Sequence, residues 1–209
     1  MAVAASLAAC GGESSSDANQ GSGNYRVKVT EARFPTTQRL GQTSLLRLGV
    51  RNTGKRTMPA LTVTISIAGK AGQGSSLPFG VRDPTPGLAQ SERPVWVLAA
   101  GYPRLAGSSE PGGATTSNRK TFAFAALKPG KTTEAVWKLS AVKAGHFTLV
   151  YSVDAGVSGT DKTKTEGGVA PGGSFVTEIS AVPPDTEVTD SGEVVEARKQ
   201  RQRPEPGGE

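Results

Sequence analysis

The sequence predicts an all-β protein, an antiparallel β-sandwich of about seven strands. Apolar and polar residues alternate in most segments between residues 25 and 182, as they do in strands with one buried face. The 27 glycines and 14 prolines among the 209 residues supply turns between these segments. Beyond the N-terminus, no segment carries apolar residues at the spacing of an amphipathic helix. Short strands separated by Gly and Pro turns are typical of a sandwich.

Each expected strand rests on this alternation. The clearest covers residues 61–67, where Leu, Val and Ile alternate with Thr and Ser, and the turn residues Asn52 and Gly54 precede it. Trp137 alternates with Leu139, which places it in the expected core. The expected strands are 25–33, 43–52, 59–67, 120–126, 132–140, 146–154 and 173–181.

Two connections are much longer than a hairpin turn. Residues 68–119 form an insertion in which 95–98 are expected as an extra edge strand, and residues 155–172 form a second loop. Loops of this length inside a compact domain are usually functional or disordered. From Pro183 onward the Pro- and Glu-rich composition predicts a disordered tail, residues 183–209.

The N-terminus carries a pattern of secretion. Residues 1–9 are small and apolar and resemble the end of a signal peptide, and Leu7-Ala8-Ala9-Cys10 resembles the lipobox of bacterial lipoproteins. The resemblance implies cleavage before Cys10 and a diacylglycerol on its thiol. No Lys or Arg precedes the apolar run, so either the start codon lies upstream or Cys10 is a free thiol.

The expected location follows from that motif. Residues 10–24 are rich in Gly and Ser and are expected to be a flexible tether between the lipid and the folded domain. The protein would then be a lipid-anchored protein of the cell membrane, facing the extracytoplasmic side, with inner and outer membrane left open. Two or three acyl chains suffice for stable anchoring.

The strands also resemble a known kind of module. The segments around Asn52-Thr53-Gly54, Pro129-Gly130 and Trp137 are similar to those of immunoglobulin-like domains of the bacterial surface kind, such as CARDB and related adhesion-type modules. Gly145 and Tyr151 extend the likeness, which covers residues 25–182 apart from the insertion. Together with the lipobox, it resembles lipoproteins of high-GC actinobacteria. The resemblance implies an immunoglobulin-like sandwich, and a fold does not by itself give a function.

Charge and reactive residues exclude several functions. The net charge is +6, but Lys and Arg are spread out, and the basic run 198–203 has no aromatic neighbour, so we predict no nucleic-acid binding. The single cysteine allows no internal disulfide, and the single histidine, His146, has no second histidine with which to share a metal. No nucleophile elbow or complete phosphate loop occurs. We predict no cofactor, no metal, no catalytic residue and no enzyme activity.

The remaining candidates for binding are two aromatic residues of the insertion. Trp96 and Tyr102, flanked by Pro94 and Pro103, either pack the insertion onto the sandwich or stack on a sugar or a partner peptide. The leading hypothesis is a membrane-anchored binding, adhesion or structural module that presents its long loops to a protein or other envelope partner. The alternative is a carbohydrate-binding sandwich that recognises cell-wall or environmental glycans. A third hypothesis, a hydrolase with paired carboxylates, stays open, as does the oligomeric state.

Overall fold

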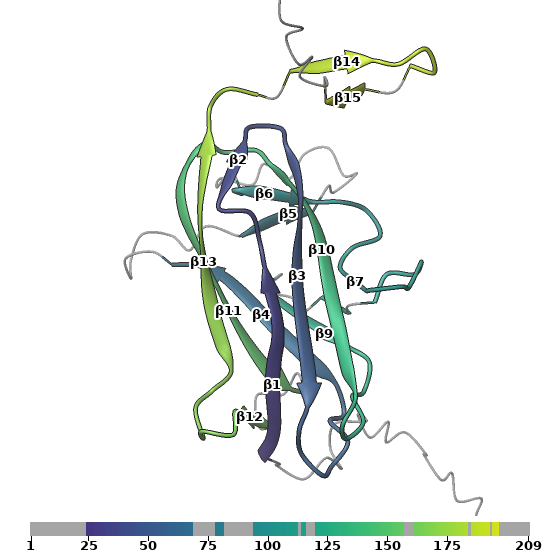
Figure 1. Ribbon diagram of the computed structural model, residues 1–209, viewed down its shortest axis with the longest axis vertical. Coiled ribbons are helices and arrows are strands. Elements are labelled where there is room, and N and C mark those ends of the chain that lie inside the picture. Colours follow the sequence, from purple (N-terminus) through teal and green to yellow (C-terminus); the bar gives the residue numbers. More distant parts are fainter. Residues whose placement is uncertain are drawn as a thin grey trace, which may run out of the picture.

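The computed structural model describes residues 24–68, 78–81, 94–112, 114–115, 120–156, 161–183, 185–192 and 194–196. All regular structure within these ranges is β-strand, so the predicted all-β class is confirmed (Figure 1). The strands are β1 (Asn24–Arg33), β2 (Thr37–Arg39), β3 (Thr43–Asn52), β4 (Leu61–Ile67), β5 (Phe79–Val81), β6 (Trp96–Leu98), β7 (Arg104–Leu105), β8 (Ala114–Thr115), β9 (Thr121–Phe124), β10 (Thr132–Ala141), β11 (Gly145–Ala155), β12 (Lys162–Lys164), β13 (Gly172–Ser180), β14 (Thr186–Val188) and β15 (Val194–Glu196).

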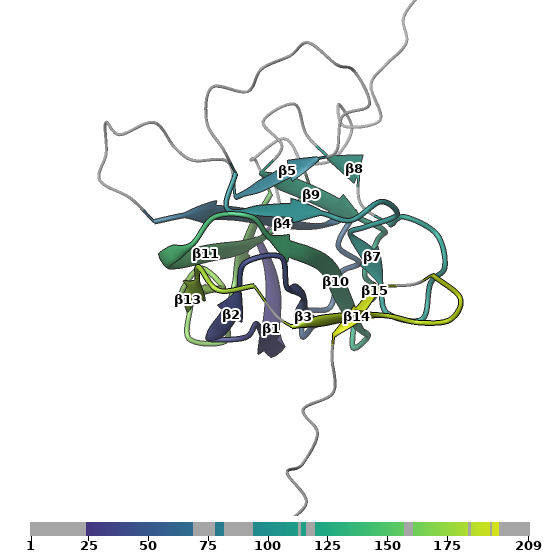
Figure 2. The ribbon, with the colours of Figure 1, turned by 90° about the horizontal axis from the view of Figure 1, so that it is seen from above.

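The strands form two packed sheets. The first sheet has the order β12-β1-β3-β10-β6-β5, with β7 also paired to β10, and the second has the order β2-β13-β11-β4-β9-β8. Figure 2 shows the two layers from above, with β1 and β3 in one and β4 and β9 in the other. The inner faces of the two sheets enclose one apolar core.

The seven expected strands correspond to β1, β3, β4, β9, β10, β11 and β13, with ends shifted by two residues or fewer. The expectation of purely antiparallel sheets needs a correction. The pairs β1–β12, β2–β13 and β5–β6 are parallel. Each of them attaches a three-residue strand, β12, β2 or β5, to the edge of a sheet. Strands this short carry too few residues for an alternating pattern to show.

The insertion, residues 68–119, is part of the sheets where it is described. β6 and β7 pair with β10, and β8 pairs with β9. The predicted strand at 95–98 is present as β6, but it lies between β10 and β5 and not at an edge. The described strands of the insertion therefore belong to the two sheets of the sandwich.

The expected tail also contains regular structure. β14 and β15 form a two-stranded hairpin within residues 183–209, closed by a hydrogen bond from the Gly192 amide to the Thr189 carbonyl. Gly192 has a φ of 80°, a left-handed conformation that glycine adopts without strain. The sequence pattern missed this hairpin because each strand has three residues.

Aromatic residues from both sheets fill the core. Trp137 of β10 is fully buried, as expected, and packs edge-to-face against Phe122 and Phe124 of β9 at centroid distances of 5.8 and 5.7 Å. Tyr151 of β11 stacks on Phe175 of β13, and its burial raises the pKa of the phenol. The contacts of Trp137 join the two layers, whereas the Tyr151–Phe175 pair packs two neighbouring strands of the second sheet.

Candidate functional site

Trp96, which the sequence singles out for partner binding, is fully buried. Its exposed fraction is 0%, and its ring packs edge-to-face against Phe34 and Phe147. The indole Nε1 donates a hydrogen bond of 2.9 Å to Oε1 of Gln38. A ring enclosed in this way cannot stack on a sugar or a peptide, so the assignment of Trp96 to partner binding is wrong. Trp96 instead packs the insertion onto the sandwich, which was the other interpretation of its position.

Tyr102 is half-buried and packs against the same core. Its peptide bond to Pro103 is cis, and the guanidinium carbon of Arg104 lies 4.5 Å from its ring centroid. Arg104 therefore occupies one face of the ring in a cation–π contact. Without Trp96 beside it, Tyr102 offers no two-ring platform, and its role in partner binding stays a prediction.

Cys10, the predicted lipidation site, lies outside the described residues. The first described residue is Asn24, 14 positions further along the chain. An extended chain of that length spans at most about 50 Å. The position of Asn24 therefore marks the point at which a tether from a lipid on Cys10 would join the folded domain.

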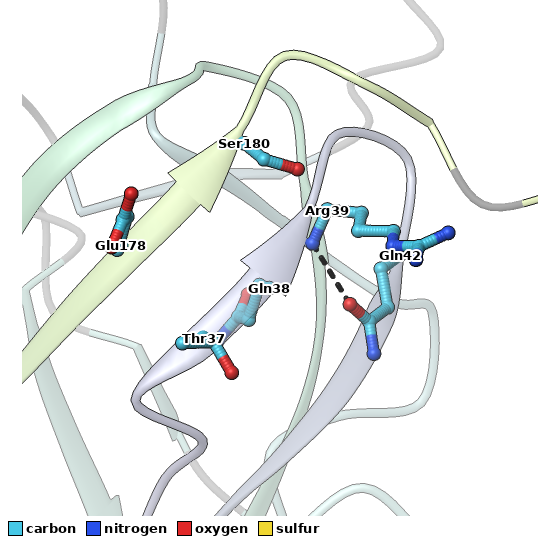
Figure 3. A pocket seen from close by; sticks show the side chains of 6 residues that line it. All are labelled: Thr37, Gln38, Arg39, Gln42, Glu178 and Ser180. Carbon is cyan, nitrogen blue, oxygen red and sulfur yellow. Dashed lines mark hydrogen bonds between the residues drawn. The ribbon is translucent and has the colours of Figure 1, made fainter.

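A polar cleft with a volume of about 420 Å³ lies at the edge of the second sheet and is lined by the paired strands β2 and β13 and by the turn after β2. Figure 3 shows its lining from β2, from β13 and from the turn that leads into β3. The lining residues are Thr37, Gln38, Arg39, Gln42, Glu178 and Ser180. We call the end of the sandwich that holds this cleft the cleft end.

The cleft combines both signs of charge with uncharged hydrogen-bonding groups. The Arg39 amide donates a hydrogen bond of 2.8 Å to Oε1 of Gln42, which fixes the turn after β2. The Arg39 and Glu178 side chains make no ion pair within the described residues. Gln38 is only 3% exposed, and its Nε2 has no hydrogen-bond partner there. The cleft can therefore accept a polar group of either charge.

The opposite end of the sandwich is organised by Asn52, which is fully buried. Its Nδ2 donates hydrogen bonds of 2.8 Å to the carbonyls of Arg56 and Leu127, and its Oδ1 accepts one from the Gly54 amide. The amides of Thr53 and Gly54 also bond to the Arg26 carbonyl. Asn52 thus ties the β3–β4 turn to the β9–β10 turn and to β1.

Exposed cations gather around these turns. The start of β1, β12, the β3–β4 turn and the β9–β10 turn all lie at the end of the sandwich where Asn24 begins the domain (Figure 1). We call this the basic end, and define it by nine exposed residues: Arg26, Lys28, Arg51, Lys55, Arg56, Lys128, Lys131, Lys162 and Lys164.

No described residue forms an ion pair with the cations of the basic end. Within the described ranges, the ion pairs are Arg33–Glu31 at 3.3 Å and Arg47–Glu134 at 2.6 Å, and both lie further along the first sheet. The hydrogen bond to Glu134 raises the pKa of Arg47 above its ordinary value. Arg56 instead lies 4.9 Å from the ring centroid of Tyr25. The basic end therefore presents positive charge to solvent.

Reactive groups of the kinds considered from the sequence do not gather in the described part of the chain. No group of three or more His, Cys, Asp or Glu residues there is placed to hold a metal ion. His146 lies exposed on β11. Nor does any helix within the described ranges have the length and apolar composition that crossing a bilayer requires.

Comparison with known proteins finds similarity in structure but no relative in sequence. No family model matches the chain, and no relative is found among curated proteins. Solved structures similar to it include the CARDB domain of the PF1109 protein from Pyrococcus furiosus, with a TM-score of 0.39 and 12% identity over 76% of this chain and 93% of that domain. Another is alpha-2-macroglobulin from Escherichia coli from domain MG7 to the C-terminus, with a TM-score of 0.41 and 15% identity over 77% of this chain and 17% of that one.

A third similar structure is AvmM, which catalyses macrocyclization in alchivemycin A biosynthesis, with a TM-score of 0.40 and 13% identity over 78% of this chain and 92% of AvmM. At these identities the likeness concerns the β-sandwich and says nothing of activity. The β-sandwich expected from the sequence is confirmed by the two packed sheets of the structure itself, and the CARDB domain is among the solved structures similar to the chain.

Sequence reasoning missed both the cleft and the basic end. β2, which supplies half of the cleft, has three residues and no alternating pattern. The nine cations are spread from position 26 to position 164, so only the strand order reveals that they meet. A usable signal existed for one element, since Asn52-Thr53-Gly54 predicted the turn that carries Lys55 and Arg56.

Proposed function

We propose that this protein is a membrane-anchored, extracytoplasmic lipoprotein whose β-sandwich works as a non-catalytic binding module. Cys10 carries a diacylglycerol, and residues 10–24 connect it to the domain. The lipobox resemblance at Leu7-Ala8-Ala9-Cys10 supports the anchor. The sandwich presents a binding site away from the membrane.

The observation that carries this proposal is the placement of Asn24 and the polar cleft at opposite ends of the sandwich. β1 starts at Asn24 and runs toward the cleft end, and β2 follows directly after it (Figure 1). β3 returns over 10 residues, which corresponds to about 33 Å. A chain anchored through Asn24 therefore holds the cleft on the far side of the domain.

The cleft suits a polar partner in the cell envelope, either a protein or a glycan. Arg39 and Glu178 offer opposite charges, and the hydroxyls of Thr37 and Ser180 both donate and accept hydrogen bonds. The glycan hypothesis in which Trp96 and Tyr102 stack on a sugar no longer holds, because Trp96 is buried in the core. Recognition by polar groups of the cleft takes its place in the proposal.

Intact-mass analysis of protein from the membrane fraction of its own host tests the anchor. The expected mass begins at Cys10 and includes a diacylglycerol. The Cys10→Ala variant should lose the modification. It should be washed from the membrane fraction by about 0.5 M salt, which screens contacts between charges, whereas the lipidated parent chain should remain. A membrane-extracted chain with an unmodified Cys10 contradicts the anchor.

Retention on the envelope fraction of the host tests the binding module separately. The double variant Arg39→Ala/Glu178→Ala should be retained at least tenfold less than the parent chain, because it removes both charges of the cleft. The matched control is Lys143→Ala/Glu187→Ala, which removes one exposed charge of each sign outside the cleft lining. Equal retention of both double variants contradicts a role for the cleft.

A further inference from the structure

We propose that the basic end binds directly to an anionic lipid bilayer, so that the folded domain itself, and not only an acyl chain, attaches to the membrane surface. This goes beyond the proposed anchor and rests on the charge and geometry of the basic end; only the supporting argument from the position of Asn24 rests on the proposed lipidation of Cys10. The surface is the set of nine exposed cations that defines the basic end. Its partner is the layer of negatively charged headgroups of a bilayer.

The balance of charge at this end is strongly positive. Among the residues that the structure describes, the acids located there are Asp154, Glu166 and Asp161, of which Asp161 is only 1% exposed. Asp154 is half-buried at the end of β11, and Glu166 is exposed in the loop after β12. Nine cations against two accessible acids create a local positive potential that attracts an anionic surface.

The cations are held in a fixed arrangement. The β1 start and β12 are joined by parallel pairing, with Asn24 opposite Lys162 and Arg26 opposite Lys164. Asn52 bonds to the backbone of both lysine-bearing turns, at Arg56 and at Leu127. A preformed patch loses less conformational entropy on binding than charges carried on a mobile segment.

The distribution of these cations favours a surface over a strand of nucleic acid. They come from four separate segments that meet at one end of the sandwich (Figure 1), and so form a broad patch instead of a line. Binding of single-stranded nucleic acid also needs exposed aromatic rings on which bases stack. Tyr25, the aromatic residue nearest to the patch, is 9% exposed and lies beneath Arg56.

The place where the chain enters the domain points to the same partner. Asn24 lies within the basic end, paired with Lys162, and the predicted lipid site is 14 residues before it. A bilayer that holds Cys10 is therefore within about 50 Å of this patch at most. Contact at the basic end would set the orientation of the domain and direct the cleft end toward the envelope.

Co-sedimentation with vesicles tests the proposal. The protein is the full chain carrying Cys10→Ala, so no acyl chain contributes to binding. Vesicles of phosphatidylcholine with about one-third phosphatidylglycerol are compared with vesicles of phosphatidylcholine alone. Binding is expected to the anionic vesicles only, and it should be lost when the salt rises from about 0.05 M to about 0.5 M.

Two matched double variants locate the binding surface. Lys55→Gln/Lys162→Gln removes two charges from the basic end and should weaken binding about 25-fold, or about fivefold per charge. Lys138→Gln/Lys143→Gln removes two exposed charges from elsewhere on the domain and should change binding by less than about twofold. All four side chains are exposed, and thermal unfolding of each variant checks that the fold is retained.

Four results would overturn the proposal. One is equal binding to neutral and anionic vesicles. Another is an equal loss in both double variants, or loss only when Arg198, Lys199 and Arg201 of the C-terminal basic run are replaced by Gln. The last is binding to a soluble poly(glycerol phosphate) polymer without any binding to vesicles, which would assign the surface to a polymer. None of these results depends on whether Cys10 is lipidated in the host.

Discussion

Among the described residues, each end of the sandwich has one buried side-chain amide, and the two amides differ in how completely they are hydrogen-bonded. Asn52, at the basic end, makes three hydrogen bonds, all to main-chain groups. Gln38, at the cleft end, accepts one hydrogen bond, from the Trp96 indole, and its Nε2 has no partner among the described residues. Both are nearly inaccessible, at 0% and 3% exposure.

The difference teaches what each amide does for the fold. The partners of Asn52 are backbone groups of two turns, which keep their hydrogen-bonding needs whatever side chain occupies position 52. The partner of Gln38 is another side chain, which a second substitution can remove. Asn52 is therefore required for the shape of the basic end, whereas the hydrogen bond of Gln38 at the cleft end is needed only as long as Trp96 is present.

The largest effect is expected for Asn52→Ala. The substitution removes three hydrogen bonds of a buried side chain. The Leu127 carbonyl keeps the Met58 amide and the Gly54 amide keeps the Arg26 carbonyl, but the two turns lose the side chain that joins them. The lost hydrogen bonds and the small cavity together should cost about 4 kcal/mol in the free energy of unfolding. Urea unfolding of the variant measures this loss. A loss below about 1.5 kcal/mol would show that water or a rearranged turn replaces the amide.

A comparison with Asn52→Asp separates the donors from the acceptor at this site. Aspartate keeps an acceptor for the Gly54 amide but places a carboxylate against two carbonyl oxygens. At neutral pH it should be at least as destabilising as alanine, because a buried charge faces like partial charges. If aspartate instead retains most of the stability, the two Nδ2 hydrogen bonds are not what holds the turns together.

The next largest effect is expected for Trp96→Phe, at the cleft end. The change removes the indole donor, leaves both polar atoms of the Gln38 amide without a partner, and opens a small cavity beside Phe34 and Phe147. These terms sum to about 3 kcal/mol in the free energy of unfolding, again measured in urea. A change within about 0.5 kcal/mol of zero would mean that the hydrogen bond and the larger ring contribute nothing.

The two amides also mark where sequence reasoning succeeds. Asn52 lies in a local pattern, Asn-Thr-Gly, whose turn geometry is set by neighbouring residues, so the turn and the flanking strands β3 and β4 were predictable. The same holds for the other long strands, because the alternation of apolar residues is a local consequence of burying one face.

Gln38 marks where it fails. Its partner Trp96 is 58 positions away in a three-residue strand, so neither the local sequence pattern nor the spacing of residues predicts their hydrogen bond. Trp96 was assigned to partner binding for the same reason, since prolines and a long insertion surround it in the sequence while β10 and β5 flank its strand in space. The basic end is equally non-local, because the order of the strands brings its cations together.

A smaller effect is expected for Gln38→Leu alone. The leucine leaves the Trp96 Nε1 donor unpaired, but it also removes the buried Nε2 that had no partner. The two contributions oppose each other, so the net loss should be about 1 kcal/mol. Urea unfolding beside Trp96→Phe gives the comparison, and a loss larger than that of Trp96→Phe would contradict it.

The smallest effect is expected when Gln38→Leu is added to the Trp96→Phe variant. No indole donor remains to be left unpaired, and the leucine replaces a buried amide that has no partner, so the second substitution should cost nothing or stabilise the variant by up to about 1 kcal/mol. The four chains form a double-mutant cycle whose interaction energy measures the Gln38–Trp96 pair. An additive cycle would show that the pair is not coupled. No second side-chain substitution can rescue Asn52→Ala in the same way, because its partners are backbone atoms.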